Sequence, residues 1–553
     1  MKLKLKKLTS LDKVFLHKEP SATCEPIRTV LANEAFSFQI AWFAEAEEAD
    51  GHHAPYVRVT VEEDYGGAVR LKEVGHVPSE LPAYPNADDD YLTKLPGLFP
   101  DPLYELEDGI VRLVANQWRS LWVEFHPDGR LPAGTYPIRV TLADLEGREL
   151  ATVEHTVEVL GALLPKQELI HTEWLHYDCL AQWYGVEPLS EPHWELIERY
   201  IKTAVDHGVN MILTPLFTPP LDTKIGGERL TVQLVGVSEN KGRYTFDFSR
   251  LKRFIDMARR QGIEYFEMSH LFTQWGALAA PKIVAESGGE LRRIFGWDTE
   301  ASDPAYKAFL DSFLPELTAA LREWGVADRV WFHVSDEPHR DHLESYRAAR
   351  NLVEPHLRGF RMIDALSDFD FYAEGLVKTP VPANDCIEPF LAAQVPNLWT
   401  YYCCMQYRDV SNRFMAMPSR RNRILGAQLY KFSLEGFLHW GYNFWNSQYS
   451  VKPIHPYAVT DAGCAFPSGD AFLVYPGENG KPVESIRLKV LREALYDLRA
   501  MQLLERLTSR EFVLNILEDG GSKPITFKDY PREESYLTAV RTRINEEIAI
   551  RSR

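Results

Sequence analysis

The chain has 553 residues, which is too long for one ordinary domain and suits two or three. Its 45% hydrophobic and 25% charged residues are typical of a globular protein and exclude a disordered or fibrous chain. The 79 acidic and 61 basic residues give a net charge of −18, so a nucleic-acid partner is not expected, because the chain repels phosphates. Aromatic residues reach 12%, and their flat side chains can stack on sugar rings.

The sequence also bears on the cellular compartment. Residues 1–7 are basic, but no apolar run of a secretion signal follows them. No apolar run approaches the ~20 residues of a membrane span. The six cysteines are scattered without any Cys-x-x-Cys spacing, which predicts reduced thiols instead of disulfides. We therefore expect a cytoplasmic protein that has no membrane partner.

The first 165 residues have the pattern of β-strands. Apolar and polar residues alternate with period two in the segments 56–61, 121–125, 136–142 and 153–159. Turn clusters such as Pro127-Asp128-Gly129 separate these segments. Short strands at this spacing predict an N-terminal β-sandwich over residues 1–165.

From about residue 168 the hydrophobic period becomes that of helices. The segments 191–207, 247–261 and 304–324 each carry apolar residues along one helical face. A glycine follows each of them, and a strand of the buried type begins a few residues later. Alternating helices and strands predict a parallel sheet with right-handed crossovers.

Eight strands can be assigned in this region, at residues 173–177, 210–213, 263–266, 330–334, 361–365, 385–387, 398–403 and 436–445. They predict a (β/α)₈ TIM-type barrel over residues 166–483, with an open doubly wound sheet as the alternative. Long segments follow the strands and short loops precede them, which favours the barrel. Residues 484–553, with an amphipathic helix at 486–504, are predicted to form a C-terminal helical segment packed on the barrel.

The segment Ser335-Asp336-Glu337-Pro338 closes the fourth predicted strand. Pro338 should end the strand and turn both carboxylates over the barrel mouth. Adjacent carboxyl groups in a partly dry pocket raise the pKa of one of them, so that one stays protonated and the other ionised. Glycoside cleavage needs this division of labour. The alternative interpretation is a solvated acidic turn.

The expected position of an attacking nucleophile holds no carboxylate in this sequence. Retaining barrel glycosidases with an Asn-Glu-Pro motif also carry a Glu before Pro after strand four, and their nucleophilic carboxylate ends strand seven. The seventh predicted strand has no carboxylate, and Glu388 after strand six is the nearest substitute. If the enzyme has no nucleophilic carboxylate, the 2-acetamido carbonyl oxygen of the substrate can attack the anomeric carbon and form an oxazoline. One carboxylate then holds the acetamido N–H and its neighbour protonates the leaving oxygen, which suits an Asp-Glu pair.

Several further motifs support one family. They lie at residues 97–103, 116–123, 171–178, 336–338, 441–445 and 469–477. Through them nearly the whole chain resembles glycoside hydrolase family 123 and its relatives grouped as the domain of unknown function 4091. The resemblance implies a β-N-acetylgalactosaminidase that acts by substrate assistance with retention. It also implies that Asp336 polarises the acetamido group and that Glu337 is the general acid/base.

Sugar-binding candidates lie near the ends of the predicted strands. A sugar site needs an aromatic platform and a few polar groups for the hydroxyls. The candidates are Trp174, His176, Asp178, His270, Trp275, Tyr401, Tyr402, Trp440, Trp445 and Asp470. For the tryptophans the alternative is barrel core, and for Asp470 it is a loop carboxylate. Either Tyr401 or Tyr402 suits a hydrogen bond to the acetamido carbonyl.

The sequence predicts no metal and no cofactor. His333, His339 and His342 flank the acidic pair at spacings that match no strong ligand pattern. The triplet at residues 88–90 is three aspartates, for which we expect a solvated loop in preference to a calcium site. No phosphate-binding glycine loop follows a strand. We expect a glycosidase with a glycan substrate, for which N-acetylgalactosamine is preferred over N-acetylglucosamine; a non-catalytic carbohydrate-binding protein is the alternative.

Overall fold

The computed structural model describes residues 2–21, 25–45, 56–519 and 524–552. Its N-terminal part contains two five-stranded sheets. The first has the order β1 (Lys2–Thr9), β3 (Phe36–Glu45), β8 (Trp118–Phe125), β5 (Val69–Ser79), β6 (Gly97–Glu105). The second has the order β2 (Thr29–Leu31), β10 (Glu149–Leu160), β9 (Gly134–Ala143), β4 (Tyr56–Val61), β7 (Ile110–Arg112). All four segments with period-two alternation lie within strands.

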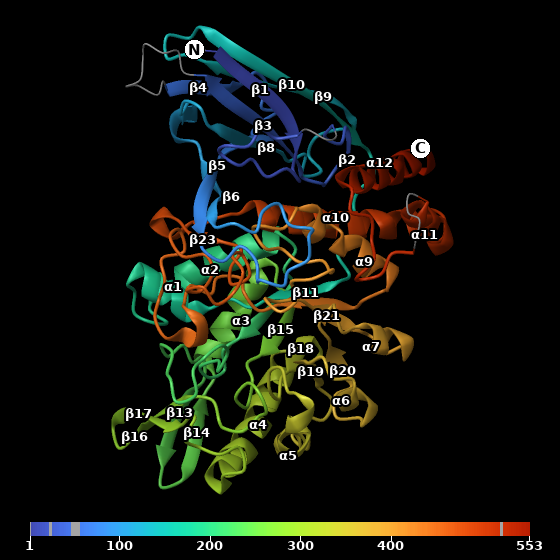
Figure 1. Ribbon diagram of the computed structural model, residues 1–553. Helices are drawn as coiled ribbons and strands as arrows, with labels where there is room; N and C mark the ends of the chain where they lie inside the picture. The colour runs from blue at the N-terminus through green and yellow to red at the C-terminus, as the bar shows by residue number, and fades with distance from the viewer. Residues whose placement is uncertain (1, 22–24, 46–55, 520–523, 553) are drawn as a thin grey trace.

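The first sheet is buried on both faces. One face shares an apolar core with the second sheet, through side chains such as Trp42 and Val123. The other face, with Trp122 and Val77, belongs to the large core of the rest of the chain. The outer face of β9 is exposed and its residues alternate between exposed and buried. The N-terminal sheets therefore pack directly on the remainder of the molecule (Figure 1).

The central part is a nearly closed barrel of eight parallel strands. Around it the strands follow in the order β20 (Thr379–Val381), β19 (Arg361–Ala365), β18 (Val330–Phe332), β15 (Tyr265–Met268), β12 (Met211–Thr214), β11 (Ile170–Glu173), β22 (Gly436–His439), β21 (Trp399–Tyr401). A bridge between Ala383 and Tyr401 joins the two end strands. The barrel helices are α1 (Tyr177–Tyr184), α2 (Glu191–Asp206), α3 (Ser249–Gln261), α4 (Pro304–Glu323), α5 (Leu343–Val353), α6 (Asp370–Ala373), α7 (Glu388–Ala392), α8 (Arg420–Arg423) and α9 (Leu425–Lys431).

Three sequence-based expectations were wrong in detail. The first strand is Ile170–Glu173, where residues 173–177 were expected, and Tyr177 already begins α1. The sixth strand is Thr379–Val381, and residues 385–387, which were expected to form it, lie after the strand. The expected long loops on the rim instead contribute a four-stranded sheet, which lies at the far end from the N-terminal sheets (Figure 1). Its strands are β14 (Arg243–Asp247), β13 (Gly236–Asn240), β16 (Ile283–Ser287) and β17 (Glu290–Phe295). The sequence patterns did not reveal these strands, because each is only five or six residues long.

The C-terminal segment is helical, with α10 (Ile486–Leu507), α11 (Arg510–Glu518) and α12 (Glu534–Arg551), after the small hairpin β23 (Tyr475–Pro476) and β24 (Pro482–Val483). In Figure 1, α10 runs between the N-terminal sheets and the barrel. It is buried on most sides and is not a surface helix: even Arg487 and Lys489 are each only 2% exposed. Arg487 forms an ion pair with Asp101, and Lys489 forms one with Glu124. Both carboxylates belong to the N-terminal sheets.

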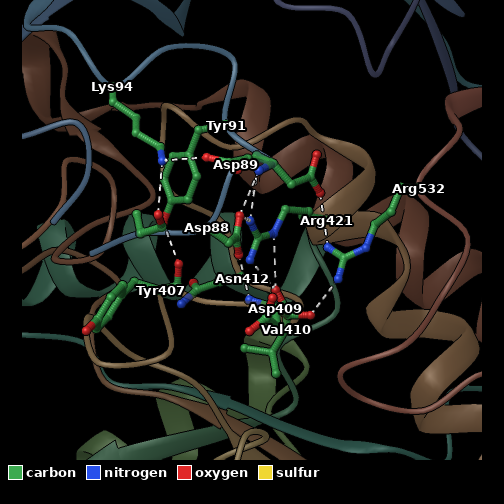
Figure 2. A network of polar contacts seen from close by, with 12 residues as sticks. Asp88, Asp89, Tyr91, Lys94, Tyr407, Asp409, Val410, Asn412, Arg421 and Arg532 are labelled. Atoms are coloured by element: carbon green, nitrogen blue, oxygen red, sulfur yellow. Dashed lines mark hydrogen bonds and ion pairs between the residues drawn. The ribbon is translucent and has the colours of Figure 1, made fainter. Parts of the chain in front are cut away.

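The aspartate triplet at residues 88–90 makes polar contacts with the barrel and the C-terminal segment (Figure 2). Asp88 accepts a hydrogen bond of 2.6 Å from the backbone N–H of Asp409. Asp90 forms an ion pair of 3.0 Å with Arg532. The expectation of a solvated loop was therefore wrong for these two carboxylates, which neutralise arginines brought from distant parts of the chain.

Two further observations concern the described residues as a whole. None of the helices they form is long and apolar enough to span a membrane. The described cysteines are free thiols: Cys179 and Cys403 are buried, Cys386 and Cys404 are partly exposed and Cys464 is exposed. Cys24 lies outside the described residues.

Candidate active site

A cavity of about 160 Å³ lies at the carboxyl ends of the barrel strands. This end of a barrel carries the active site in characterised enzymes of this fold. The lining residues come from nearly every strand end and from the long segments that follow. They are Trp174, Leu221, Asp222, Gln274, Trp275, Asp336, Glu337, Ala365, Tyr401, Cys403, Cys404, Leu438, Trp440, Gln448, Tyr449 and Phe466.

The adjacent Asp336 and Glu337 both line this cavity and are partly exposed. The strand β18 ends at Phe332, earlier than expected, so the chain turns before Pro338 instead of at it. Glu337 lies in the left-handed backbone region, with φ at 43°. Its backbone N–H donates to the carbonyl of Ala365 at 3.0 Å, which ties the turn to the neighbouring strand. The turn brings both carboxylates to one cavity, where residues of a regular strand would alternate between faces.

Burial raises the pKa of Asp336 well above its ordinary value, and the negative charge of Glu337 raises it further. The positive charge of the buried His333 acts in the opposite direction. Adjacent carboxyl groups in a pocket that is partly dry resist simultaneous ionisation. The pair is thus suited to keep one carboxyl group protonated while the other is ionised.

Tyr401, at the end of β21, lies in the cavity and contacts Glu337. Its hydroxyl donates a hydrogen bond of 2.5 Å to Glu337 Oε1. Burial and the charge of Glu337 raise the pKa of Tyr401 well above its usual value, so the phenol stays protonated. Tyr402 is wholly buried on the opposite side of the strand, in contact with Phe437. Because successive side chains of a strand point to opposite faces, only Tyr401 reaches the site.

Beneath the carboxylate pair lies a buried chain of polar groups that the sequence did not reveal. Glu267 Oε1 contacts His333 Nε2 at 2.5 Å and accepts a hydrogen bond of 2.9 Å from Trp174 Nε1. On its other side His333 Nδ1 contacts Asp364 Oδ1 at 3.0 Å, and Tyr346 donates to the second oxygen of Asp364. Burial lowers the pKa of His333, but the two carboxylates outweigh it and raise that pKa to about 10. The barrel interior therefore holds an imidazolium between two acids.

The sequence contained a clue to this buried row of polar groups. Glu267 sits within a strand that is otherwise apolar, between Phe266 and Met268, and Asp364 lies between Ile363 and Ala365. A carboxylate in a buried strand needs a partner, because an unpaired buried charge is costly. The partners were not identifiable, because they lie on other strands.

Three predicted aromatic residues, Trp174, Trp275 and Trp440, line the cavity. Trp174 is held by Glu267, and Trp440 donates through Nε1 to Asp470 Oδ2 at 3.1 Å. Trp275 lies opposite Tyr449, with ring centroids 5.8 Å apart. These rings offer apolar surface to a sugar, while their indole N–H groups are already bound or lie at the rim.

The other predicted residues do not line the cavity. Asp178 forms a buried ion pair with Arg229 at 2.7 Å, and His176 contacts the same guanidinium at 3.0 Å. His270 is buried and stacks on His333 with ring centroids 4.2 Å apart. Trp445 is 2% exposed and donates to the backbone carbonyl of Val474. For these four residues the structure shows packing and support instead of a place on the cavity wall.

Asp470 and Glu388 have opposite environments. Asp470 is buried behind Trp440, where burial raises its pKa to about 7 despite the nearby charge of Arg413. Glu388 begins α7, its side chain is 47% exposed and it pairs with Lys528 at 3.5 Å. Glu388 is absent from the cavity lining, so it is not placed to attack a sugar there.

The described residues include one cluster with metal-ligand character, His270, His333 and Asp364, whose candidate ligand atoms lie within 4.8 Å of one another. Both nitrogens of His333 already contact carboxylates. A protonated imidazole has no lone pair to offer a metal. This cluster is therefore better suited to keep His333 protonated than to bind a metal ion. His339 and His342, the other predicted histidines, lie at or within the turn Arg340–His342, outside the cavity lining.

Sequence reasoning missed five polar or sulfur-containing lining residues, namely Asp222, Gln448, Tyr449, Cys403 and Cys404. Asp222 and Gln274 are linked, since the backbone N–H of Asp222 donates to Gln274 Oε1 at 2.6 Å. Burial raises the pKa of Asp222 to about 6. These residues lie in long segments after the strands, which only the tertiary structure folds over the barrel.

Comparison with known proteins points to one family. A family model described as glycoside hydrolase 123, catalytic domain, matches residues 174–504. A family 123 glycoside hydrolase from Clostridium perfringens, described in a study of glycolipid glycan hydrolysis, has a similar structure: the TM-score is 0.75 at 14% identity, over 99% of this chain and 98% of that one. At this identity the likeness shows the fold. No curated protein sequence matches the chain.

Two other solved structures resemble the chain more weakly. A putative β-galactosidase from Bacteroides fragilis has a TM-score of 0.32 at 9% identity, over 84% of this chain and 58% of that one. A family 5 mannosidase from Rhizomucor miehei has a TM-score of 0.34 at 11% identity, over 62% of this chain and 95% of that one. No argument rests on these two.

The eight-stranded barrel and the matched catalytic domain define a glycoside hydrolase. The chain belongs to glycoside hydrolase family 123, since the family model covers more than half of its length.

Proposed function

We propose that this enzyme is a retaining exo-glycosidase that releases terminal β-linked N-acetylhexosamine, with N-acetylgalactosamine preferred, by substrate-assisted catalysis. The observation that carries the proposal is that adjacent Asp336 and Glu337 line one cavity while β21 ends in Tyr401. Among the described lining residues, Asp222 is the remaining acid. An attacking group supplied by the substrate fits a site whose carboxylates are paired side by side.

In the proposed first step, the acetamido carbonyl oxygen attacks the anomeric carbon and the bond to the leaving oxygen breaks. Glu337 gives its proton to that oxygen, and ionised Asp336 accepts a hydrogen bond from the acetamido N–H, which gains positive charge. In the second step Glu337 takes a proton from a water that attacks the anomeric carbon and opens the oxazoline. Two inversions at one carbon give net retention.

The surroundings support these roles. Tyr401 donates to Glu337 and so orients its carboxylate. Trp174 and Trp440 provide apolar faces for the sugar ring in the same cavity. The similar Clostridium perfringens enzyme is described with glycolipid glycans, so glycans of this kind belong among the substrates to be tested.

Two features of the whole chain also remain proposals. We propose a division into residues 1–165, 166–483 and 484–553, as an N-terminal β-sandwich, a catalytic barrel and a helical segment. We propose a cytoplasmic location on the sequence alone, and fractionation of cells that express the full-length protein would test it.

The test of the function is a panel of chromogenic glycosides that differ only at carbon two. Substrate assistance predicts turnover of 2-acetamido glycosides, with 2-hydroxy glycosides slower by orders of magnitude. A thiazoline that mimics the oxazoline should inhibit strongly. Equal turnover of the two series would contradict the proposal.

A covalent enzyme nucleophile is the rival mechanism, and Asp222 is the acid placed to supply it. The Asp222→Asn variant should retain substantial turnover of 2-acetamido substrates if the acetamido group attacks. Complete loss of activity in this variant, combined with insensitivity of the wild-type enzyme to the thiazoline, would favour the covalent mechanism. A non-catalytic carbohydrate-binding protein would bind the sugars and turn over none of them.

A further inference from the structure

Two adjacent cysteines form part of the cavity wall. Cys403 and Cys404 follow β21 directly and line the same cavity as Glu337 and Tyr401. Both are free thiols, Cys403 buried and Cys404 partly exposed. The proposed hydrolysis uses neither of them, so their place in the wall calls for a separate account.

The backbone around the two thiols is held by side chains of its own loop. The amide oxygen of Gln406 accepts hydrogen bonds from the backbone N–H of Cys403 at 2.9 Å and from its thiol at 3.2 Å. Asn412 donates to the carbonyl of Cys403 at 2.9 Å. The two residues are therefore adjacent in a fixed loop, and both line the cavity.

Both thiols are protonated at neutral pH. The neighbouring Cys404 side chain, together with burial, raises the pKa of Cys403 well above its usual value. The Cys403 side chain acts to lower the pKa of Cys404, but burial still raises that pKa. Reactions that need a thiolate, such as alkylation, should be slow here. A reaction that consumes two neighbouring S–H groups remains open to the pair.

We propose that Cys403 and Cys404 form a dithiol site for trivalent organoarsenicals, R–As=O, inside the substrate cavity. Two S–H bonds break and two As–S bonds form, and the oxygen leaves as water with both protons. Arsenic stays trivalent, so the step needs no oxidant or reductant. The ring that results spans two adjacent residues and cannot form on an isolated cysteine.

The cavity also suits the organic group of such a ligand. Trp440 and Phe466 line it, with ring centroids 5.5 Å apart, and offer aromatic surface to a phenyl substituent. An arsenic atom on Cys403 would lie two residues from Tyr401, the partner of Glu337. Occupation of the site should therefore block the sugar. Binding depends on the cavity alone, whereas the loss of activity rests on the proposed function.

The experiment uses phenylarsine oxide and the full-length protein. We expect a mass increase of one phenylarsenic group, the loss of two titratable thiols and an adduct on the peptide that contains residues 403–404. The exposed Cys464 provides the matched control, and Cys464→Ser should bind to the same extent. Cys403→Ser and Cys404→Ser should each lose stoichiometric binding. Peptide mapping on the wild type keeps the test decisive if those variants do not fold.

Further measurements separate this site from general thiol reactivity. 2,3-Dimercaptopropanol should remove the arsenic and restore activity, whereas a similar concentration of a monothiol should not. Iodoacetamide should modify Cys464 faster than the pair, because that thiol is exposed. An adduct on Cys386 or Cys464, or unchanged binding by Cys404→Ser, would overturn the proposal. Binding of one equivalent to a protein that fails to hydrolyse hexosaminides would leave the dithiol site standing and refute the function instead.

Discussion

Glu337 has a left-handed backbone conformation that a residue with a side chain adopts at a cost of about 1–3 kcal/mol. Trp275, on the neighbouring segment, has a φ of 59° and donates from its backbone N–H to the carbonyl of Asp336 at 2.9 Å. Two strained residues thus hold each other's segments at the cavity. Strain of this kind persists where the surrounding structure over-determines it, and it concentrates at functional sites.

The first prediction concerns the proton donor. Glu337→Gln should reduce kcat/KM about 10²–10⁴-fold on substrates with poor leaving groups, because no acid protonates the departing oxygen. On activated aryl glycosides, whose leaving groups need little protonation, the loss should be much smaller. Steady-state kinetics on both substrate types measure the difference. An equal loss on both would count against the role of Glu337 as an acid.

The reactive state of the pair carries one proton, on Glu337, while Asp336 is ionised. The pKa of Asp336 is raised by burial and by the charge of Glu337, so this raised pKa marks the loss of the last proton of the pair. Activity should therefore fall as the pH rises through a pKa well above that of an ordinary aspartate. Asp336→Asn should lower kcat on activated and poor substrates alike and shift this alkaline limb. The pH dependence of kcat/KM is the measurement, and an unchanged limb in the variant would refute the assignment.

His333 makes stability depend on pH. Its pKa is about 10 in the folded protein against 6.5 as the ordinary value, so its stabilising contribution is complete below pH 6.5 and disappears as the pH rises through 10. The free energy of unfolding should fall by about 1.4 kcal/mol per pH unit over that interval from this group. Urea unfolding of wild type and His333→Gln at several pH values tests it. Parallel pH dependences would show that His333 is not charged in the fold.

At the scale of elements, the segment after β21 forms the cavity wall and the loop between β5 and β6 braces it. Asp88 in that loop binds the backbone N–H of Asp409 and pairs at 3.0 Å with Arg421, whose side chain is fully buried. Tyr91 donates to the carbonyl of Tyr407 (Figure 2). The N-terminal region thus holds the same segment that carries Cys403 and Cys404.

The aspartate triplet supplies its own matched control for this brace. Asp88→Ala should cost about 3 kcal/mol of unfolding free energy, because it leaves the buried charge of Arg421 without its partner. It should also raise KM by displacing the cavity wall. The neighbouring Asp89 is fully exposed and pairs only with Lys94 among the described contacts, so Asp89→Ala should change neither quantity measurably. Equal effects of the two variants would disprove the brace.

At the scale of the whole molecule, buried charges join the N-terminal sheets to α10. Asp101 on β6 binds Arg487 at 2.8 Å and accepts a hydrogen bond of 2.5 Å from Tyr475. Arg487 in turn donates to the carbonyls of Gly469 and Phe472, on either side of Asp470. A carboxylate of the N-terminal region therefore helps to position the loop behind Trp440.

Removal of that carboxylate should affect the entire fold. Asp101→Ala should lower the free energy of unfolding by about 3–5 kcal/mol, because Arg487 would remain buried without a counter-charge. Glu105→Ala on the same strand is the control: its pair with the exposed Lys481 should contribute little, and its other partner, the buried Lys72, keeps its ion pair with Glu484. Chemical denaturation of both variants measures the contrast, and similar values would show that the buried pair is not a major stabilising contact.

Local patterns predicted part of the order of elements and located the acidic pair. Hydrophobic periodicity and glycine positions are local properties, so they predicted four of the N-terminal strands, three barrel helices and most of the barrel strands. The position of Asp336 and Glu337 after the fourth strand followed from the same local pattern. The sixth strand and the strands of the rim sheet escaped it, because each is short.

Which side chains share the cavity depends on the tertiary structure and could not be read from local sequence patterns. Tyr401 lines it while Tyr402 does not, and the His333 imidazolium is clamped by Glu267 and Asp364 from neighbouring strands. His176 and Asp178, which looked equally suitable, instead support Arg229. The reason is physical: a contact between residues far apart in the chain depends on strand register and barrel closure, and these are set by packing of the whole molecule.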